Sequence, residues 1–184
     1  NTTEQNAKMT FNGETNIKLE EVLLSRGRIN TADTVNITAK KIKLGGDVTQ
    51  NGGHLTLTTT TENIETDVTN KVDKNGEKTN SEENTITFNG NNNSQLTIKT
   101  PALVGSWGKF KFKKYGDSNL TLNATKDGGE VALKGNHTDK TNMGIEFEDS
   151  TLNVGAGKLN VETTVTGKND LAIKKADGNE NLNV

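Results

Sequence analysis

The side chains able to do acid–base or metal chemistry are scattered along this chain, with one local exception. In GIEFEDS, Glu146 and Glu148 are two residues apart and would share one face of a strand, with Asp149 beside them. Such a group has the composition of a weak cation site, whereas solvated charge on a strand surface is the plainer interpretation. The other candidate acids are Asp47, Asp127, Asp139 and Asp170.

Further signals of catalysis are missing. His54 and His137 have no second ligand at metal-binding spacing. The sequence has no G-x-S-x-G elbow, and its GGD and DGG segments lack the tandem repeat of calcium-binding nonapeptides. We therefore expect no enzyme, no metal and no cofactor.

A second candidate site is the segment GSWGKFKFKKY, residues 105–115, which holds the only Trp and the only Tyr of the chain. If this segment is a strand, Phe110 and Phe112 point inward and Trp107 points outward with the lysines. One interpretation is a binding site; the other is a packed strand whose lysines are solvated and whose Trp covers the end of a coil. The candidate ligand-binding residues here are Trp107, Lys109, Lys111, Lys113 and Tyr115.

Composition limits the fold that must position these residues. Leu, Ile, Val and Phe make up about a fifth of 184 residues, close to the level at which chains fail to build a core. The net charge is -2 and there is no Cys, so the few apolar residues must be regularly spaced. No apolar run is long enough for a membrane span, and NTTEQNAKMTF is not a signal peptide. Near-zero charge and two Arg argue against nucleic-acid binding.

The apolar residues alternate with polar ones along most of the chain. HLTLTTTT, SQLTIKT, GKFKFKK, SNLTLNA and KLNVE all have period two, which indicates half-buried strands separated by Gly, Asn and Asp turns. The best helical candidate, IKLEEVLLSRG, is equally compatible with a strand at Val22–Leu24. The fold class is therefore all-β.

A longer repeat refines this class. Ile17, Ile37 and Leu55 open alternating strands, with sequence separations of 20 and 18. A later series, with separations of 21, 21 and 19, consists of Phe110, Val131, Leu152 and Leu171. A period near twenty, without the leucine-rich-repeat frame, predicts a right-handed parallel β-helix of about eight coils with outward Thr and Asn ladders. A sandwich of hairpins is the rival, supported by Asn-Gly pairs that begin at Asn12, Asn51, Asn75 and Asn89.

The predicted inward residues follow from the alternation. They are Leu55, Leu57, Leu96, Ile98, Phe110, Phe112, Leu120, Leu122, Val131, Leu133, Leu152, Val154, Leu159, Val161, Leu171 and Ile173. Residues 59–85 break the alternation, and we expect them to leave the solenoid as an extruded loop. We treat residues 1–184 as a single β-helical segment.

The phrases HLTLTTTT, SNLTLNA, STLNVGAGKLNVETT and DLAIKKADGNENLNV resemble the repeats of filamentous-haemagglutinin-like exoproteins, most closely the high-molecular-weight adhesins of two-partner secretion. The resemblance implies an internal segment of a secreted bacterial surface adhesin, exported through an outer-membrane partner. It further implies binding of host-cell glycoproteins, with sialylated glycans as the receptor class. A structural stalk without a receptor site is one alternative, and a polysaccharide lyase or hydrolase on a β-helix is another.

The resemblance also gives meaning to six N-x-[ST] sequons, which would otherwise be attributed to chance in an Asn- and Thr-rich chain. Adhesins of this type carry hexoses that a cytoplasmic transferase attaches to such asparagines. The candidates are Asn1, Asn36, Asn92, Asn119, Asn123 and Asn136.

For a sialylated ligand, the aromatic segment offers suitable chemistry. An indole face packs against the C–H face of a sugar ring, and ammonium groups offset a sialic-acid carboxylate. Arg26 and Arg28, the only arginines, present bidentate forks that also suit a carboxylate, although they lie in another part of the chain. The binding interpretation therefore places the receptor site first at residues 107–115 and second at the two arginines.

Overall fold

The computed structural model describes residues 8–24, 28–66, 85–91, 93–105, 109–116, 119–135, 144–163, 165–168 and 172–175. These residues form strands joined by turns and bends, and none of them is helical. In the part of the chain that is described, no helix is long and apolar enough to cross a bilayer.

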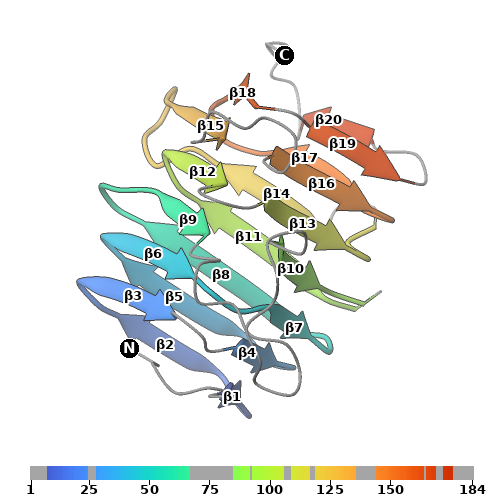
Figure 1. Ribbon diagram of the computed structural model, residues 1–184. Coiled ribbons are helices and arrows are strands. Elements are labelled where there is room, and N and C mark those ends of the chain that lie inside the picture. The colour runs from blue at the N-terminus through green and yellow to red at the C-terminus, as the bar shows by residue number, and fades with distance from the viewer. Residues whose placement is uncertain are drawn as a thin grey trace.

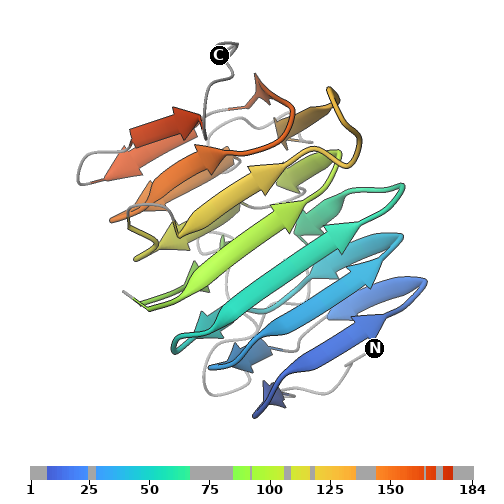
Figure 2. The same cartoon turned by 180° about the vertical axis from the view of Figure 1, so that it is seen from behind.

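The strands belong to three sheets (Figures 1 and 2). Sheet A contains β3 (Glu21–Leu24), β6 (Lys41–Leu44), β9 (Ile64–Thr66), β12 (Ala102–Gly105), β15 (Glu130–Gly135) and β18 (Lys158–Glu162). Sheet B contains β1 (Lys8–Phe11), β4 (Arg28–Thr31), β7 (Val48–Gln50), β10 (Thr85–Asn89), β13 (Lys109–Lys113), β16 (Gly144–Glu148) and β19 (Val165–Lys168). Sheet C contains β2 (Thr15–Lys18), β5 (Val35–Ala39), β8 (His54–Thr59), β11 (Gln95–Lys99), β14 (Leu120–Asn123), β17 (Thr151–Val154) and β20 (Ala172–Lys175).

The chain visits the sheets in a fixed cycle, B then C then A, so neighbours within a sheet are three strands apart in sequence. We call one such cycle a coil. Every strand pairing among the described residues is parallel, which agrees with a parallel β-helix and rules out the hairpin sandwich. Within the described ranges, the sheets of six and seven strands correspond to about seven coils, where the sequence predicts about eight for the whole chain.

Coil length is regular only at the two ends of the stack. Val35 pairs with Leu55, and Leu152 pairs with Ile173, so these coils have the predicted length. In the middle the coils are longer: Leu55 pairs with Leu96, at about twice the predicted separation, and Leu120 pairs with Leu152. The first predicted series is thus nearly right, since Ile17 and Ile37 are in register with Leu57 rather than Leu55.

The second series of repeating positions in the sequence prediction is wrong, because its described members do not pair with one another in one sheet. Phe110 lies in sheet B, Val131 in sheet A and Leu152 in sheet C, so they are not equivalent positions of successive coils. Leu171 lies outside the described residues. Alternation identifies a strand, but it contains no information about which sheet the strand joins.

The Asn-Gly pairs mark corners between sheets. Asn12 and Asn51 follow β1 and β7, and Asn89 is the last residue of β10, so all three precede a strand of sheet C. Asn75 lies outside the described residues. At Gly52 and Gly53 the backbone has φ of 107° and 71°, and a Cβ at Gly53 would lie 2.4 Å from the carbonyl oxygen of Asp33. Glycine is therefore needed here for the corner of a coil, not for a hairpin.

One core cluster collects inward residues of all three sheets. The predicted inward residues from Leu55 to Leu159 are buried, Val161 is partly buried and packs against this cluster, and only the backbone of Ile173 is described. In sheet B the core contains an aromatic stack along the direction in which the coils repeat. The ring centroids of Phe88 and Phe112 are 5.0 Å apart, and those of Phe112 and Phe147 are 5.5 Å apart.

The predicted loop begins later than expected. Residues up to Thr59 complete β8, and Ile64–Thr66 form β9, which pairs with β6 and β12. Residues 67–84 lie outside the described part of the chain. The boundary expected at residue 59 is therefore corrected, because the sparse apolar residues there still include Ile64, which is fully buried.

Candidate functional site

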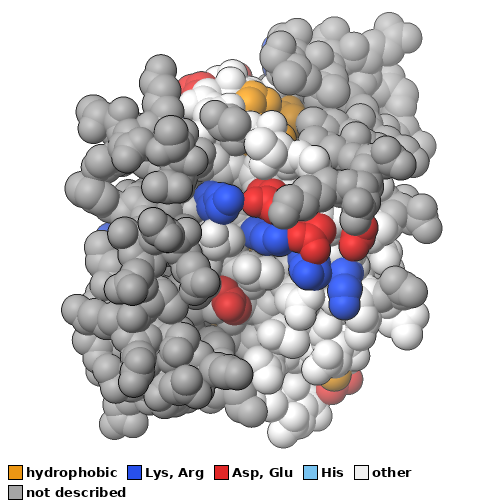
Figure 3. Space-filling model, turned by 45° about the vertical axis from the view of Figure 1, so that its right-hand side comes forward, with side chains coloured by type: hydrophobic (Ala, Val, Ile, Leu, Met, Phe, Trp, Pro, Cys, Tyr) orange, Lys and Arg blue, Asp and Glu red, His pale blue; other side chains and the backbone are white. Residues whose placement is uncertain are grey.

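The outer face of sheet B carries a ladder of charges on β13 and β16 (Figure 3). The strand alternation that buries Phe110 and Phe112 turns Lys109, Lys111 and Lys113 outward. Register then places Lys111 beside Glu146 and Lys113 beside Glu148. We call these five residues, Lys109, Lys111, Lys113, Glu146 and Glu148, the charge ladder.

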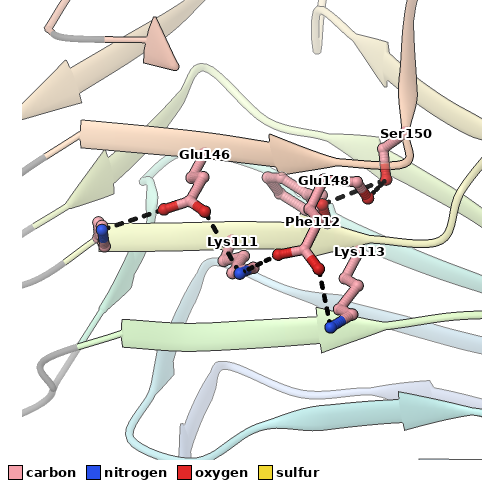
Figure 4. A network of polar contacts seen from close by, with 7 residues as sticks. Lys111, Phe112, Lys113, Glu146, Glu148 and Ser150 are labelled. Carbon is pink, nitrogen blue, oxygen red and sulfur yellow. Dashed lines mark hydrogen bonds and ion pairs between the residues drawn. The ribbon is translucent and has the colours of Figure 1, made fainter. Parts of the chain in front are cut away.

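Each glutamate of the charge ladder lies between two lysines (Figure 4). The carboxylate of Glu146 is 3.1 Å from the Lys109 ammonium and 3.3 Å from that of Lys111. Glu148 pairs with Lys111 and, at 2.8 Å, with Lys113. Only 9% of the Glu146 side chain is exposed, so this carboxylate is enclosed by its partners and its strand neighbours.

The protonation equilibria reflect this pairing. Burial raises the pKa of Glu146, but hydrogen bonds from Lys109 and Lys111 outweigh burial and leave the pKa lowered. Hydrogen bonds from Lys111 and Lys113 lower the pKa of Glu148 to about 2. Both carboxylates are therefore ionised near neutral pH, with their charge compensated by lysines.

This pairing changes the meaning of two sequence predictions. Glu146 and Glu148 are neither a cation site nor freely solvated charges, because lysines occupy the positions that a cation would take. The three lysines do face outward as predicted, but each already has a carboxylate partner. Within the described residues, no group of three or more acids, His or Cys is placed to hold a metal ion.

Tyr115 is buried in the core and does not lie on the outer surface. Its hydroxyl donates a hydrogen bond to the Gln50 side-chain oxygen at 2.8 Å, and burial raises its pKa. Its ring lies against Gly90, where a Cβ would be 2.7 Å from the ring. The predicted ligand-binding role of Tyr115 is therefore corrected: this residue supports a corner from inside.

The corner around Tyr115 is held by a polar network that runs from buried Ser94 to exposed Asn93. The Ser94 hydroxyl lies 2.9 Å from the Asn91 side-chain oxygen and accepts a hydrogen bond from the Gly52 amide at 3.0 Å. The Asn91 side-chain oxygen also accepts a bond from the Asn93 amide at 3.0 Å. These bonds fix the surface that lies above the network.

Two open hollows lie next to the charge ladder. The corner hollow, about 630 Å³ in volume, is lined by Asn91, Asn93, Lys114, Gly116 and Asp149. The face hollow, about 310 Å³, is lined by Asp47, Thr49, Thr87, Asn89, Lys113 and Lys114. The face hollow lies where the short outward side chains of β7 and β10 meet the long lysines that follow in β13. Lys114 borders both hollows.

The backbone is unusual at two lining residues. Lys114 and Asp149 directly follow β13 and β16 and have φ of 65° and 49°, in the left-handed region that is uncommon for residues other than glycine. Gly90 occupies the place of Lys114 in the preceding coil. The Gly90 amide donates to the backbone carbonyl of Lys113, and the Lys114 amide donates in the same way to the backbone carbonyl of Glu148. Strained backbone of this kind is found preferentially at functional sites.

The structure does not describe the side chains of the remaining predicted ligand-binding residues. Trp107 and Arg26 lie outside the described residues, and only the backbone of Arg28 is described, at the start of β4. Among the other acids, Asp47 accepts a hydrogen bond from the Thr87 amide at 2.9 Å, and Asp127 is exposed between β14 and β15. His54 lies 2.8 Å from the Thr97 hydroxyl. Asp139, Asp170 and His137 lie outside the described part of the chain.

Three of the six sequon asparagines are described. Asn36 is half-buried on β5, and its amide donates to the Asn16 side-chain oxygen at 2.8 Å. The Asn123 side-chain oxygen accepts a bond from the Ala156 amide at 2.9 Å, and Asn119 is half-buried before β14. Asn1, Asn92 and Asn136 lie outside the described residues. A sugar on Asn36 would take one of the two amide hydrogens and leave the other for the bond to Asn16.

Sequence reasoning missed Lys114 and the asparagines of the corner hollow. No local signal marks Lys114, because Gly90, at the same place in the preceding coil, does not have a positive φ, and the strand register is not visible in the sequence. Comparison with protein-family models, with curated proteins and with solved structures gave no match to this chain.

Proposed function

We propose that this chain is a segment of a bacterial surface adhesin that binds host glycans at the corner and face hollows. In this proposal the three sheets close into a right-handed β-helix, and the parent protein reaches the cell surface through an outer-membrane secretion partner. The observation that carries the proposal is the pair of adjoining polar hollows that share Lys114.

The chemistry of the lining suits carbohydrate hydroxyl groups. Asn91, Asn93 and Asn89 carry amides, which can both donate and accept, and Thr49 and Thr87 add hydroxyl groups. The network beneath Asn91 holds the corner in place before a ligand arrives, which lowers the entropic cost of binding.

A sialylated ligand requires a cation for its carboxylate. Lys109, Lys111 and Lys113 are engaged by glutamates, whereas Lys114 is exposed and makes no ion pair with any residue that the structure describes. The proposed carboxylate contact therefore moves from the β13 lysines to Lys114.

A structural stalk remains the second candidate, because of the outer face of sheet C. There Thr56, Thr97 and Thr121 lie in register on neighbouring coils, as expected for a surface that only spaces a receptor-binding region. The stalk interpretation predicts no affinity for any glycan.

A glycan array probed with the purified chain separates the two candidates. The wild type should bind a subset of glycans, and Lys114→Ala combined with Asn93→Ala should reduce binding at an unchanged melting temperature. The matched control is Lys126→Ala, which removes a lysine that lines neither hollow. Absence of any glycan signal above background, with a folded wild-type protein, would favour the stalk.

A further inference from the structure

The Asn-Gly pairs that begin at Asn12, Asn51 and Asn89 lie at corners between sheet B and sheet C, and their surroundings differ. In such a pair the backbone nitrogen of the glycine can attack the side-chain carbonyl carbon of the asparagine, since glycine has no side chain to hinder the approach. We propose that Asn12 is a site of spontaneous deamidation, whereas the fold protects Asn51 and Asn89 from the same reaction. This inference is independent of the proposed glycan binding.

The reaction consumes only water. The Gly13 nitrogen loses its proton and bonds to Cγ of Asn12, the bond from Cγ to Nδ2 breaks, and ammonia leaves with that proton. Water then opens the five-membered imide at one of its two carbonyl carbons. Opening at Cγ leaves aspartate, and opening at the backbone carbonyl leaves isoaspartate, in which the main chain runs through the side chain. Either product adds one negative charge to the protein.

The pair at Asn51 is blocked at the attacking nitrogen. The Gly52 amide donates a hydrogen bond to the Ser94 hydroxyl at 3.0 Å, and both residues are buried. The Asn51 amide is held as well, by a bond to the Thr31 carbonyl oxygen at 2.9 Å. Because the bond to Ser94 must break before the Gly52 nitrogen can lose its proton and turn toward the side chain, the reaction waits for a local opening of this corner.

Asn89 is protected by both a hydrogen bond and packing. The Gly90 amide donates to the backbone carbonyl of Lys113 at 2.9 Å, directly after the paired residues of β10 and β13. Gly90 is buried against the Tyr115 ring, from which an added Cβ would be only 2.7 Å away. This contact restricts the rotation of the peptide that would bring the Gly90 nitrogen to the Asn89 side chain.

The corner at Asn12 has neither restraint. Asn12 is exposed, and the Gly13 amide donates no hydrogen bond to any residue that the structure describes. The Gly13 carbonyl oxygen accepts a bond from the Thr15 hydroxyl at 2.9 Å, which does not involve the nitrogen. A Cβ built at Gly13 would have no heavy atom within 4 Å. The corner can therefore reach the imide geometry without breaking a hydrogen bond of the Gly13 amide.

Peptide mapping by mass spectrometry, after incubation of the folded chain at mildly alkaline pH, measures the rate at each asparagine separately. All three asparagines precede glycine, so each serves as a control for the others. Asn12 should deamidate about tenfold faster than Asn51 or Asn89, the factor by which one hydrogen bond shifts an opening equilibrium. In concentrated urea, where the corners are unfolded, the three rates should converge.

Ser94→Ala tests the protection itself, because it removes the acceptor of the Gly52 amide. Deamidation at Asn51 should accelerate in this variant. The increase at Asn51 should exceed that at Asn89, whose glycine donates to Lys113 instead. Equal rates at the three asparagines in the folded wild type, or an equal change at Asn51 and Asn89 in Ser94→Ala, would overturn the inference.

Discussion

Sheets B and C have the same parallel register, yet their outer faces differ. On the central outward ladder of sheet C, short side chains repeat from coil to coil: Asn16 is followed by Asn36, then by Thr56, Thr97 and Thr121, whereas the neighbouring ladder changes from Thr58 to Lys99 and then to Asn123. On sheet B, Thr87 and Asn89 of β10 are followed by Lys111 and Lys113 of β13. Equal side chains give an even surface, whereas a change of length from one coil to the next leaves a hollow. The repeating backbone therefore creates no site by itself. The candidate site lies where the length of the outward side chains changes from one coil to the next.

The interiors of the two sheets differ as well. The inward positions of β8, β11 and β14 that lie in register are Leu or Ile, whereas Phe88, Phe112 and Phe147 form a stack in β10, β13 and β16. The aromatic stack thus lies directly beneath the charge ladder and next to the face hollow. The same coils therefore contain both the aromatic part of the core and the charge ladder on the surface.

The largest expected effect concerns this stack. Phe112→Ala should lower the free energy of unfolding by about 3–5 kcal/mol, because Phe112 is fully buried between two other rings. Phe112→Leu should cost clearly less, since Leu fills the equivalent core positions of sheet C. Urea unfolding monitored by circular dichroism measures both. Equal losses for Ala and Leu would mean that ring stacking, rather than burial, holds these coils together.

A smaller effect is expected at the corner. Gly90→Ala should cost about 1–3 kcal/mol, because the added Cβ would lie 2.7 Å from the Tyr115 ring. Gly116→Ala is the matched control in the same region, since a Cβ there has no heavy atom within 4 Å. Thermal unfolding of the two variants should differ. If they are equally stable, the Tyr115 corner is softer than the packing indicates.

The charge ladder should respond to acid. The pKa of Glu146 and of Glu148 is lower in the folded chain than the ordinary value of 4.5, so their contribution to stability is present above that pH. It is lost as the pH falls through the folded values, toward about 2 for Glu148. Glu148→Gln should therefore be less stable than the wild type at pH 7 and converge with it near pH 2. A stability difference that does not depend on pH would contradict the pairing.

The smallest effect is expected on sheet C. Thr56→Val keeps the branched shape at an outward, half-buried position, and should change the free energy of unfolding by no more than about 0.5 kcal/mol. Glycan binding should also be unchanged. A loss of binding in this variant, measured on the same array, would show that the even face takes part in recognition.

Much of the fold was predictable because alternation is a local property. HLTLTTTT shows directly that Leu55 and Leu57 point inward, and the repeat of the first coils is visible without a structure. The later register was not predictable, since Phe112 and Phe147 are paired across a separation that differs from the period of the first coils. Nothing local to either strand fixes that separation.

The site was predictable only in part, for a related reason. The outward direction of Lys109, Lys111 and Lys113 follows from alternation, but their pairing with Glu146 and Glu148 depends on the long-range register. At Lys114 the backbone turns into the left-handed region, so the alternation no longer applies and Tyr115 points inward. The alternation of inward and outward side chains therefore stops predicting their direction at the corner where the candidate site lies.

The central claim is that ligand recognition belongs to the corner and face hollows of sheet B and not to the even face of sheet C. Amide chemical shifts of the isotopically labelled chain, titrated with the glycan that binds most strongly on the array, test this directly. The account predicts that the largest changes occur at Asn89–Asn93, Lys113–Gly116 and Asp149. Changes centred on His54–Thr58 and Gln95–Lys99 would contradict it.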